Sequence, residues 1–270
     1  MLKIGVIGGS GLDNADVLQE SSAAHVLQDM RDIEISTPYG APSSSLRVLH
    51  LFDKEVYLLA RHGRDHTIPP SQVNFRANVQ ALKDRGCACI LATTAVGSLR
   101  RRIERGHLVV LDQFIDFTKH RISTFHEHFK PHSPAHTPMA DPFHKGLRGR
   151  LLEGCKDLGF PHHERGTVVT IEGPRFSTRA ESHMFRAWGA DVINMSIAPE
   201  CALANEAGLP YAAVAMSTDY DCWKEDETPV TWEEVLRIFT DNAQKVTNLL
   251  LHVIQGLTPE VLAAPAPQGT

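Results

Sequence analysis

The chain has 270 residues, 42% of them hydrophobic, so it can bury a large core as one α/β domain or as two. Its formal net charge is −5, with 27 Lys and Arg scattered along the chain, which argues against a nucleic-acid partner. No run of residues approaches the roughly 18 apolar residues of a membrane span, and the five cysteines are best interpreted as reduced thiols, so we expect a cytoplasmic protein with no membrane partner.

In the first hundred residues, apolar and β-branched runs that stop at turn sequences predict buried strands. The strands expected there cover residues 2–8, 46–52, 56–61 and 87–94. A glycine-rich loop, Gly8 to Gly11, ends the first strand, and the second and third strands form a hairpin. Ser71 is a plausible cap for a helix of about four turns that runs to Gly86, and residues 95–99 are expected to be a loop.

Residues 120–141 hold five histidines together with Pro and Ser, and they show no helical or strand period. We expect an ordered but irregular surface excursion there. No metal-site spacing frames these histidines, so surface or intersubunit roles are expected and no metal is predicted.

After the excursion, helical and strand patterns alternate, which predicts a largely parallel sheet. The expected elements are helix 142–158, strand 166–172, helix 178–188, strand 190–195, helix 199–207 and strand 211–218. A capping box that begins at Thr231 starts a last long helix. No composition break divides the chain, so we place one domain over residues 1–256 and a frayed tail over residues 257–270.

Polar residues at the ends of the early strands suggest an anion site, although each has a structural alternative. Ser10 lies in a loop that matches neither the dinucleotide fingerprint nor the P-loop, and a plain turn is the better interpretation of that loop taken alone. Arg61 and His62 could clamp phosphate through a guanidinium fork and an imidazole. A surface arginine and a core histidine explain the same two residues equally well.

Polar and aromatic residues in the second half of the chain suggest a base site. Phe176, at a strand-to-helix junction, could stack on a base, although an aromatic there is more often part of the core. Asp219 and Asp221 end an apolar strand two residues apart, so an extended chain directs both to one site. Such a pair raises the pKa of one carboxyl, which can then protonate a purine nitrogen while its neighbour accepts from an amino group. The alternative is a solvated pair that caps a helix.

Taken together, a series of motifs in this chain resembles the methylthioadenosine phosphorylases. Among them are IGVIGGSGL, TPYGAPS, LLARHGRDHTIPPSQVNFRANVQALK, TTAVGSL, EGPRFSTRAES, WGADVINMS and STDYDCWKE. The resemblance implies one α/β domain of the nucleoside phosphorylase fold, in which helices flank a twisted mixed sheet with a barrel-like part. It also implies a homotrimer with active sites at the subunit contacts.

The same resemblance implies roles for individual positions. The phosphate-binding residues would be Ser10, Arg61, His62, Thr94, Ala95 through its backbone, and Ser196. The nucleoside-binding residues would be Phe176, Ser177, Met195, Asp219, Asp221, Val235 and Leu236, with His136 of the partner subunit. Trp232 stands where the family commonly has a smaller apolar residue, and this bears on the choice of the 5′-substituent.

The reaction implied is phosphorolysis of S-methyl-5′-thioadenosine to adenine and 5-methylthioribose 1-phosphate, a pentosyl transfer in purine and methionine salvage. Inorganic phosphate is a co-substrate, and no cofactor is expected. Asp219 would protonate or strongly hydrogen-bond N7 of the leaving base, and Asp221 would accept from the exocyclic amine. Two alternatives stay open. One is a phosphorylase for adenosine, inosine or methylthioinosine, and the other is a nucleoside-binding protein that does not cleave.

Overall fold

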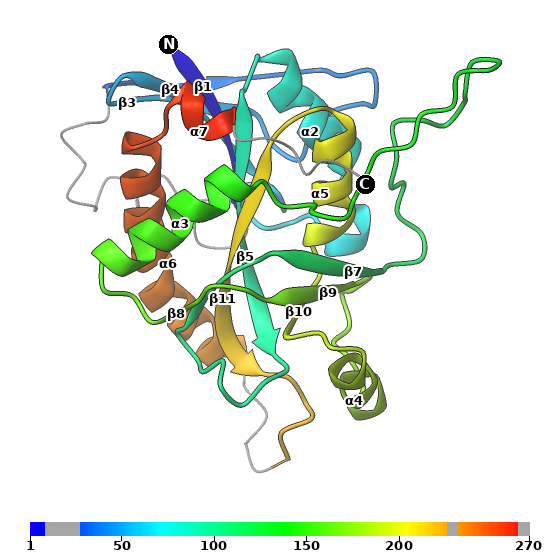
Figure 1. The fold of residues 1–270 in the computed structure, drawn as a ribbon, viewed down its shortest axis with the longest axis vertical. Helices are drawn as coiled ribbons and strands as arrows, with labels where there is room; N and C mark the ends of the chain where they lie inside the picture. The colour runs from blue at the N-terminus through cyan, green and yellow to red at the C-terminus, as the bar shows by residue number, and fades with distance from the viewer. Residues whose placement is uncertain (9–27, 226–231, 264–270) are drawn as a thin grey trace.

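The computed structural model describes residues 1–8, 28–225 and 232–263, and of residues 28, 29 and 232–241 it describes only the strand or helix in which they lie. Its strands join in one mixed sheet that helices flank on both faces, as expected (Figure 1). The main path of the sheet runs through β2 (Gln28–Ile33), β3 (Leu46–Leu51), β4 (Lys54–Ala60), β1 (Leu2–Gly8), β5 (Cys89–Ser98), β10 (Val192–Asn194), β9 (Thr167–Ile171) and β7 (Gln113–Phe117). The sheet branches at β5, because this strand also pairs with β11 (Tyr211–Tyr220). The branch continues through β6 (Leu108–Val110) to β8 (His162–His163).

Strand β5 lies at the centre of the sheet and differs from the expected strand in length. It is parallel to β1 and β11, whereas β3 and β4 form the antiparallel hairpin that the sequence predicts. The expected loop at residues 95–99 is wrong, because β5 continues to Ser98. Its last residues pair with β11 past a bulge between Ser217 and Asp219. Tertiary pairing therefore extends a strand through a glycine that locally favours a turn.

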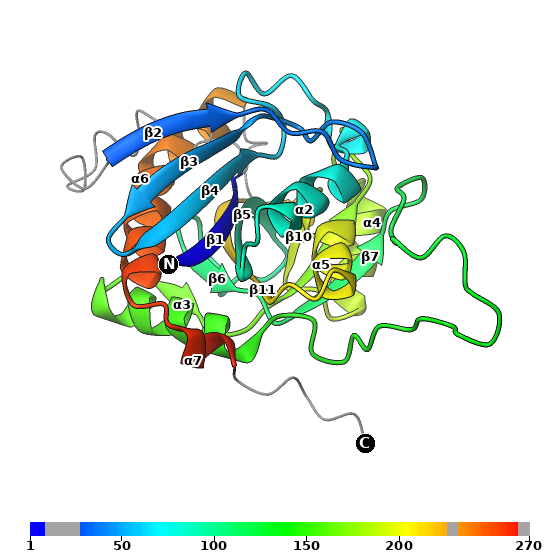
Figure 2. The same ribbon diagram turned by 90° about the horizontal axis from the view of Figure 1, so that it is seen from above.

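The helices cover the two faces of the sheet (Figure 2). On one side lie α2 (Phe75–Asp84) and α5 (Ile197–Glu206), which contact each other; on the other, α3 (Lys145–Asp157) contacts α6 (Trp232–Gln255). Helix α4 (Arg179–Ala187) follows β9. Among the helices of the described ranges, none combines the length and apolar character needed to cross a membrane.

The start of α2 corrects one sequence-based expectation. Ser71 does not cap this helix, because Pro70–Gln72 forms a separate 3₁₀ turn and Val73 is extended. Asn74 is the cap, and its side chain accepts a hydrogen bond of 3.1 Å from the backbone N–H of Ala77.

The excursion between β7 and α3 projects from the body of the molecule, as both ribbon views show (Figures 1 and 2). Its base is held by Arg121, which donates to the Glu172 carboxylate and to three backbone carbonyls. The Glu206 carboxylate accepts from the backbone N–H of Phe125 at 2.6 Å. These contacts fix the first part of the segment, which is irregular as the sequence predicts.

The segment after α6 is more ordered than the expected frayed tail. Leu257 is buried in the core, and α7 (Pro259–Leu262) contacts α3. Because Val261 and Leu262 pack on the core formed by α3, α6 and the sheet, apolar burial holds this part of the chain in place. Residues 264–270 lie outside the described ranges.

Candidate active site

The predicted anion-binding residues follow strands that are neighbours in the sheet. Strands β1 and β4 are parallel, with Gly8 opposite Ala60, and the Gly8 carbonyl accepts from the backbone N–H of Arg61 at 2.9 Å. Arg61 and His62 therefore emerge beside the end of β1, and Thr94 lies on β5, the next strand. Ser10 lies outside the described residues.

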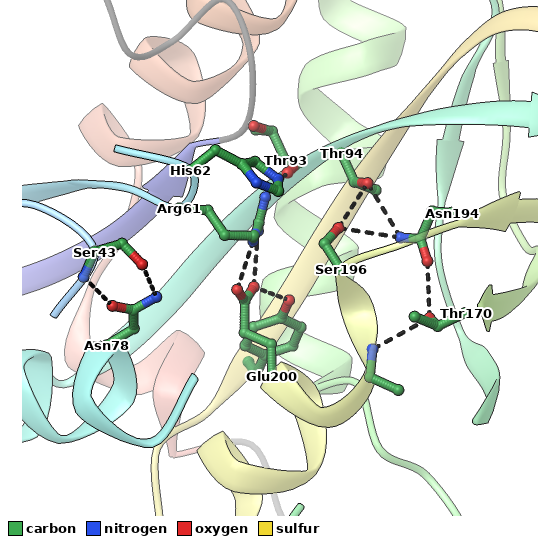
Figure 3. Close-up of polar contacts among 12 residues, drawn as sticks. Ser43, Arg61, His62, Asn78, Thr93, Thr94, Thr170, Asn194, Ser196 and Glu200 are labelled. Atoms are coloured by element: carbon green, nitrogen blue, oxygen red, sulfur yellow. Dashed lines mark hydrogen bonds and ion pairs between the residues drawn. The ribbon is translucent and has the colours of Figure 1, made fainter. Parts of the chain in front are cut away.

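Arg61 is a buried member of an ion pair, so its interpretation as a surface residue is wrong. Its side chain is 1% exposed and that of Glu200 on α5 is 0% exposed. Arg61 Nε and Nη2 donate to the two oxygens of Glu200 at 2.6 and 2.8 Å, and Nη1 donates to the Thr93 carbonyl at 3.0 Å (Figure 3). Tyr211 donates its hydroxyl to Glu200 Oε1 at 2.7 Å. The carboxylate therefore fixes the guanidinium and balances its charge.

The His62 imidazole is neutral at pH 7, so it adds no positive charge to the site. Its Nδ1 lies 2.9 Å from the Ile68 carbonyl, which can only accept, so Nδ1 carries the hydrogen. Burial and the charge of Arg61 lower the pKa of His62 from 6.5 to about 4. In this tautomer Nε2 has a lone pair and can accept the hydrogen of a P–OH group. A protonated His62 would instead donate a hydrogen from Nε2 to the anion.

Two buried hydroxyls continue the site beyond Arg61. Thr94 Oγ1 and Ser196 Oγ lie 3.0 Å apart, and Asn194 at the end of β10 is within hydrogen-bond distance of both (Figure 3). Ala95, the next residue of β5, is half-buried. Strands β5 and β10 therefore place the predicted threonine and serine together, although 102 residues separate them in the sequence.

The carboxylates predicted for the base site lie together at the end of β11. A Cβ atom on Gly97 would lie 3.4 Å from Asp219 Oδ2 and 3.5 Å from Asp221 Cβ, so both residues border the same glycine. Asp221 is 8% exposed, and Ser177 donates its hydroxyl to the Asp221 carboxylate at 2.7–2.8 Å. The alternative of a solvated capping pair is therefore wrong for Asp221. Thr218 Oγ1 donates to Asp219 Oδ1 at 2.7 Å.

Gly173 begins the loop that carries Phe176 and Ser177, and it packs closely against Met195. Its φ of +66° suits glycine, and a Cβ there would lie 2.5 Å from the Met195 sulfur. Because Met195 directly precedes Ser196 in the sequence, the start of this loop packs against the neighbour of one of the two hydroxyl residues. Phe176 itself is 75% exposed, which excludes the interpretation of this ring as a core residue.

The remaining predicted residues do not join this cluster in the described part of the chain. His136 lies exposed on the excursion, where its ring contacts Phe129 with centroids 5.6 Å apart. The side chains of Val235 and Leu236, like Ser10, lie outside the description. Within the described ranges, no group of three or more His, Cys, Asp or Glu side chains is arranged to hold a metal ion.

Sequence reasoning gave no role to three buried residues that support the site, namely Glu200, Asn194 and Thr170. Glu200 lies within the apolar run IAPECALA, and a charged residue in such a run is rarely buried unless it is paired, so the sequence does indicate a buried, paired glutamate. No comparable signal marks Asn194 and Thr170, because their role depends on contacts with residues far away in sequence.

Comparisons with known proteins agree over almost the whole chain. The model of the phosphorylase superfamily matches residues 3–255. The S-methyl-5′-thioadenosine phosphorylase of Danio rerio is 52% identical over 256 residues, which are 94% of this chain and 88% of that relative. The enzyme of the same name from Drosophila melanogaster is 47% identical over 262 residues, which are 96% of this chain and 87% of that relative.

Solved structures show the same similarity in three dimensions. Methylthioadenosine phosphorylase from Schistosoma mansoni in complex with adenine is 39% identical, with a TM-score of 0.87 and coverage of 98% of this chain and 96% of that one. A variant of adenosine/methylthioadenosine phosphorylase from the same organism, in complex with methylthioadenosine, has a TM-score of 0.84 at 39% identity and the same coverage.

Proposed function

The chain belongs to the S-methyl-5′-thioadenosine phosphorylases of the phosphorylase superfamily, and on this premise we propose that it cleaves S-methyl-5′-thioadenosine with inorganic phosphate. The products are adenine and 5-methylthioribose 1-phosphate. One observation carries the proposal: strand β5 contacts both groups of residues. Arg61 donates to its Thr93 carbonyl, Thr94 lies 3.0 Å from Ser196, and both aspartates border its Gly97. Phosphate is a co-substrate in this proposal, no cofactor takes part, and the enzyme works in the cytoplasm.

At the anion end, the proposed role of the protein is to hold phosphate beneath the ribose. Arg61 supplies charged donors whose direction Glu200 fixes. Thr94 and Ser196 donate their hydroxyls, and Ser10 and the Ala95 backbone complete the set. Because His62 is neutral with a lone pair on Nε2, it accepts a hydrogen from the phosphate and orients the remaining oxygens for attack on C1′.

At the base end, the proposed role is to stabilise adenine as it leaves. Cleavage of the glycosidic bond puts electrons on the purine, and Asp219 meets this charge by protonating or hydrogen-bonding N7. Asp221, fixed by Ser177, accepts from the exocyclic amine. Phe176 stacks on the base and Met195 lies under the ribose. A donor at N7 together with an acceptor at the exocyclic position favours an amino purine over a 6-oxopurine, whose exocyclic oxygen cannot donate.

We propose that three chains form the active enzyme, with His136 of the partner subunit at the 5′-group beside Val235 and Leu236. The excursion that carries His136 projects from the body (Figure 1) and exposes the large apolar side chains of Ile122 and Phe129. Such side chains gain stability when a neighbouring chain covers them. Sedimentation equilibrium should give three times the 29.8 kDa of one chain. A mass of 29.8 kDa at assay concentration contradicts the trimer.

The test of the proposed reaction is phosphate-dependent release of free base from methylthioadenosine, methylthioinosine, adenosine and inosine at equal concentration. We expect adenine, released fastest from methylthioadenosine. Release of hypoxanthine in its place supports a 6-oxopurine phosphorylase, and fastest release from adenosine supports an adenosine phosphorylase. Binding of the nucleosides without any cleavage supports the nucleoside-binding protein.

A further inference from the structure

A line of hydrogen bonds leads from the start of α5 to the two hydroxyls at the anion end (Figure 3). The backbone N–H of Ala198 donates to Thr170 Oγ1 at 3.2 Å, and Thr170 Oγ1 donates to Asn194 Oδ1 at 2.7 Å. A backbone N–H can only donate, so the Thr170 hydroxyl accepts there and keeps its own hydrogen for Asn194. This arrangement sets the orientation of the Asn194 amide, with Oδ1 towards Thr170 and Nδ2 on the opposite side.

The Asn194 amide nitrogen then donates to both hydroxyls, to Thr94 Oγ1 at 3.1 Å and to Ser196 Oγ at 3.4 Å. Each hydroxyl has one hydrogen and two lone pairs, and an oxygen that accepts from the amide directs its hydrogen elsewhere. At most one of the two hydrogens can lie between Thr94 and Ser196, which are 3.0 Å apart. At least one hydrogen is therefore directed at another acceptor.

Inside the chain, the acceptor available to Thr94 is the Ala95 carbonyl, 3.2 Å away. A phosphate oxygen is a stronger acceptor than a neutral carbonyl because the hydrogen bond is charge-assisted. Thr170, Asn194, Thr94 and Ser196 are all buried, so the hydrogen bonds among them form in surroundings of low dielectric, where they are stronger than in water. The network thus presents hydroxyl hydrogens to an anion that enters beside them.

We infer that Asn194 and Thr170 are positioning residues, which direct the hydroxyls of Thr94 and Ser196 to bound phosphate without touching it. This inference rests on the proposed phosphorolysis, since it assigns the two hydroxyls to the phosphate. It extends the site by one layer of side chains from β9 and β10, the strands that end at Ile171 and Asn194.

The test separates the binding of phosphate from the binding of the nucleoside. Thr170→Val keeps the shape of the side chain but removes the hydroxyl, so the Asn194 amide loses the donor that sets its orientation. The KM for phosphate should rise about tenfold, as for loss of one hydrogen bond to a charged group, while the KM for the nucleoside stays within about twofold. Thr170→Ser restores the hydroxyl and should restore the KM for phosphate.

Asn194→Asp replaces a donor with a charged acceptor that would take the hydroxyl hydrogens and repel phosphate. We expect the KM for phosphate to rise about a hundredfold or more. The matched control is Asn78→Asp on α2, because Asn78 is equally buried and holds the backbone N–H and hydroxyl of Ser43 (Figure 3). This control should lower the melting temperature but leave the KM for phosphate unchanged.

The inference is overturned if folded Thr170→Val has the wild-type KM for phosphate, or if both KM values rise together. Inorganic phosphate alone gives a second measurement that does not need the reaction. Phosphate should raise the melting temperature of the wild type and of Thr170→Ser more than that of Thr170→Val. Absence of phosphorolysis in the wild type overturns only the proposed function, whereas equal stabilisation of all three proteins, or none, overturns the positioning role.

Discussion

The anion end and the base end of the site are built differently. At the anion end, Arg61 and Glu200 are fully buried and paired, and Thr94 and Ser196 are held on strands or at the start of a helix. At the base end, Phe176 is 75% exposed on a loop. One end is therefore part of the core, and the other lies at its edge.

This difference separates two kinds of mutational effect. Changes at the anion end disturb buried charge and hydrogen bonds, so they should alter stability together with phosphate binding. Phe176 is exposed and Asp219 is half-buried, so changes at these base-end residues should alter turnover and base preference while the fold persists. The predictions below test this separation, from the largest expected effect to the smallest.

The largest effect is expected at the base end, in turnover. Asp219→Asn keeps the shape of the side chain but removes the acid, so kcat should fall about 10²- to 10⁴-fold. The free energy of unfolding should change by less than about 1 kcal/mol, because an amide of the same shape at this half-buried position disturbs little packing. Single-turnover rates and urea unfolding measure the two quantities. If the variant loses enough stability to account for its lost rate, the proposed separation between the two ends of the site is contradicted.

At the anion end, Glu200→Gln should destabilise the protein. It removes the charge of the carboxylate that pairs with the buried Arg61 guanidinium, and breaking a buried pair costs about 3–5 kcal/mol of unfolding free energy. Urea unfolding measures the loss. Tyr211→Phe is the control, because it removes only the hydroxyl that donates to Glu200 and should cost about 1 kcal/mol. If Glu200→Gln is as stable as the wild type, the buried ion pair does not contribute to the free energy of unfolding.

His62 should make the protein less stable in acid. Burial and Arg61 lower its pKa from 6.5 to about 4, so between these pH values the unfolded chain binds a proton that the folded chain does not. Stability is therefore lost as the pH falls from about 6.5 through about 4, by about 3 kcal/mol in all, and His62 contributes no pH dependence above that window.

The check for His62 is urea unfolding at pH 7 and pH 4.5 without phosphate. His62→Asn should lose about 2–3 kcal/mol less than the wild type between the two pH values. His183→Asn, at an exposed histidine on α4, should behave as the wild type. If His62→Asn shows the full loss on acidification, another group causes it.

The smallest effect is expected at Ser177. Its hydroxyl donates to both oxygens of Asp221, so Ser177→Ala frees that carboxylate to rotate. We expect the KM for the nucleoside to rise about fivefold, as for one ordinary hydrogen bond, with the KM for phosphate unchanged. Ser177→Thr keeps the hydroxyl and serves as the control. A rise in the KM for phosphate would show that the two ends are coupled.

The sequence predicted those parts of the molecule that depend on local pattern. The hairpin β3–β4, the presence of strands that lead to Arg61 and Asp219, and the irregular excursion all follow from runs of apolar residues and turn signals, although β4 ends at Ala60 and β11 continues to Tyr220. It did not predict the pairing that extends β5 through Gly97, because a strand that pairs on β11 overrides a local turn preference.

The sequence also did not predict the partners of the site residues. Glu200 lies 139 residues from Arg61, and Thr170 lies 24 residues from Asn194, so neither contact leaves a local pattern. The tautomer of His62 depends in the same way on a carbonyl that only the fold brings near. Residue types suggested candidate groups for an anion site, whereas the charge state of His62 and the direction of the hydrogen bonds required the structure.

The most direct test of the account is the fate of phosphate during cleavage of methylthioadenosine by the wild-type protein. Free adenine and phosphate are measured in one reaction, with the phosphorus signal followed by nuclear magnetic resonance. The account predicts one sugar 1-phosphate formed for every adenine released, and no release when phosphate is omitted. Release of adenine with free methylthioribose and unchanged phosphate would contradict it.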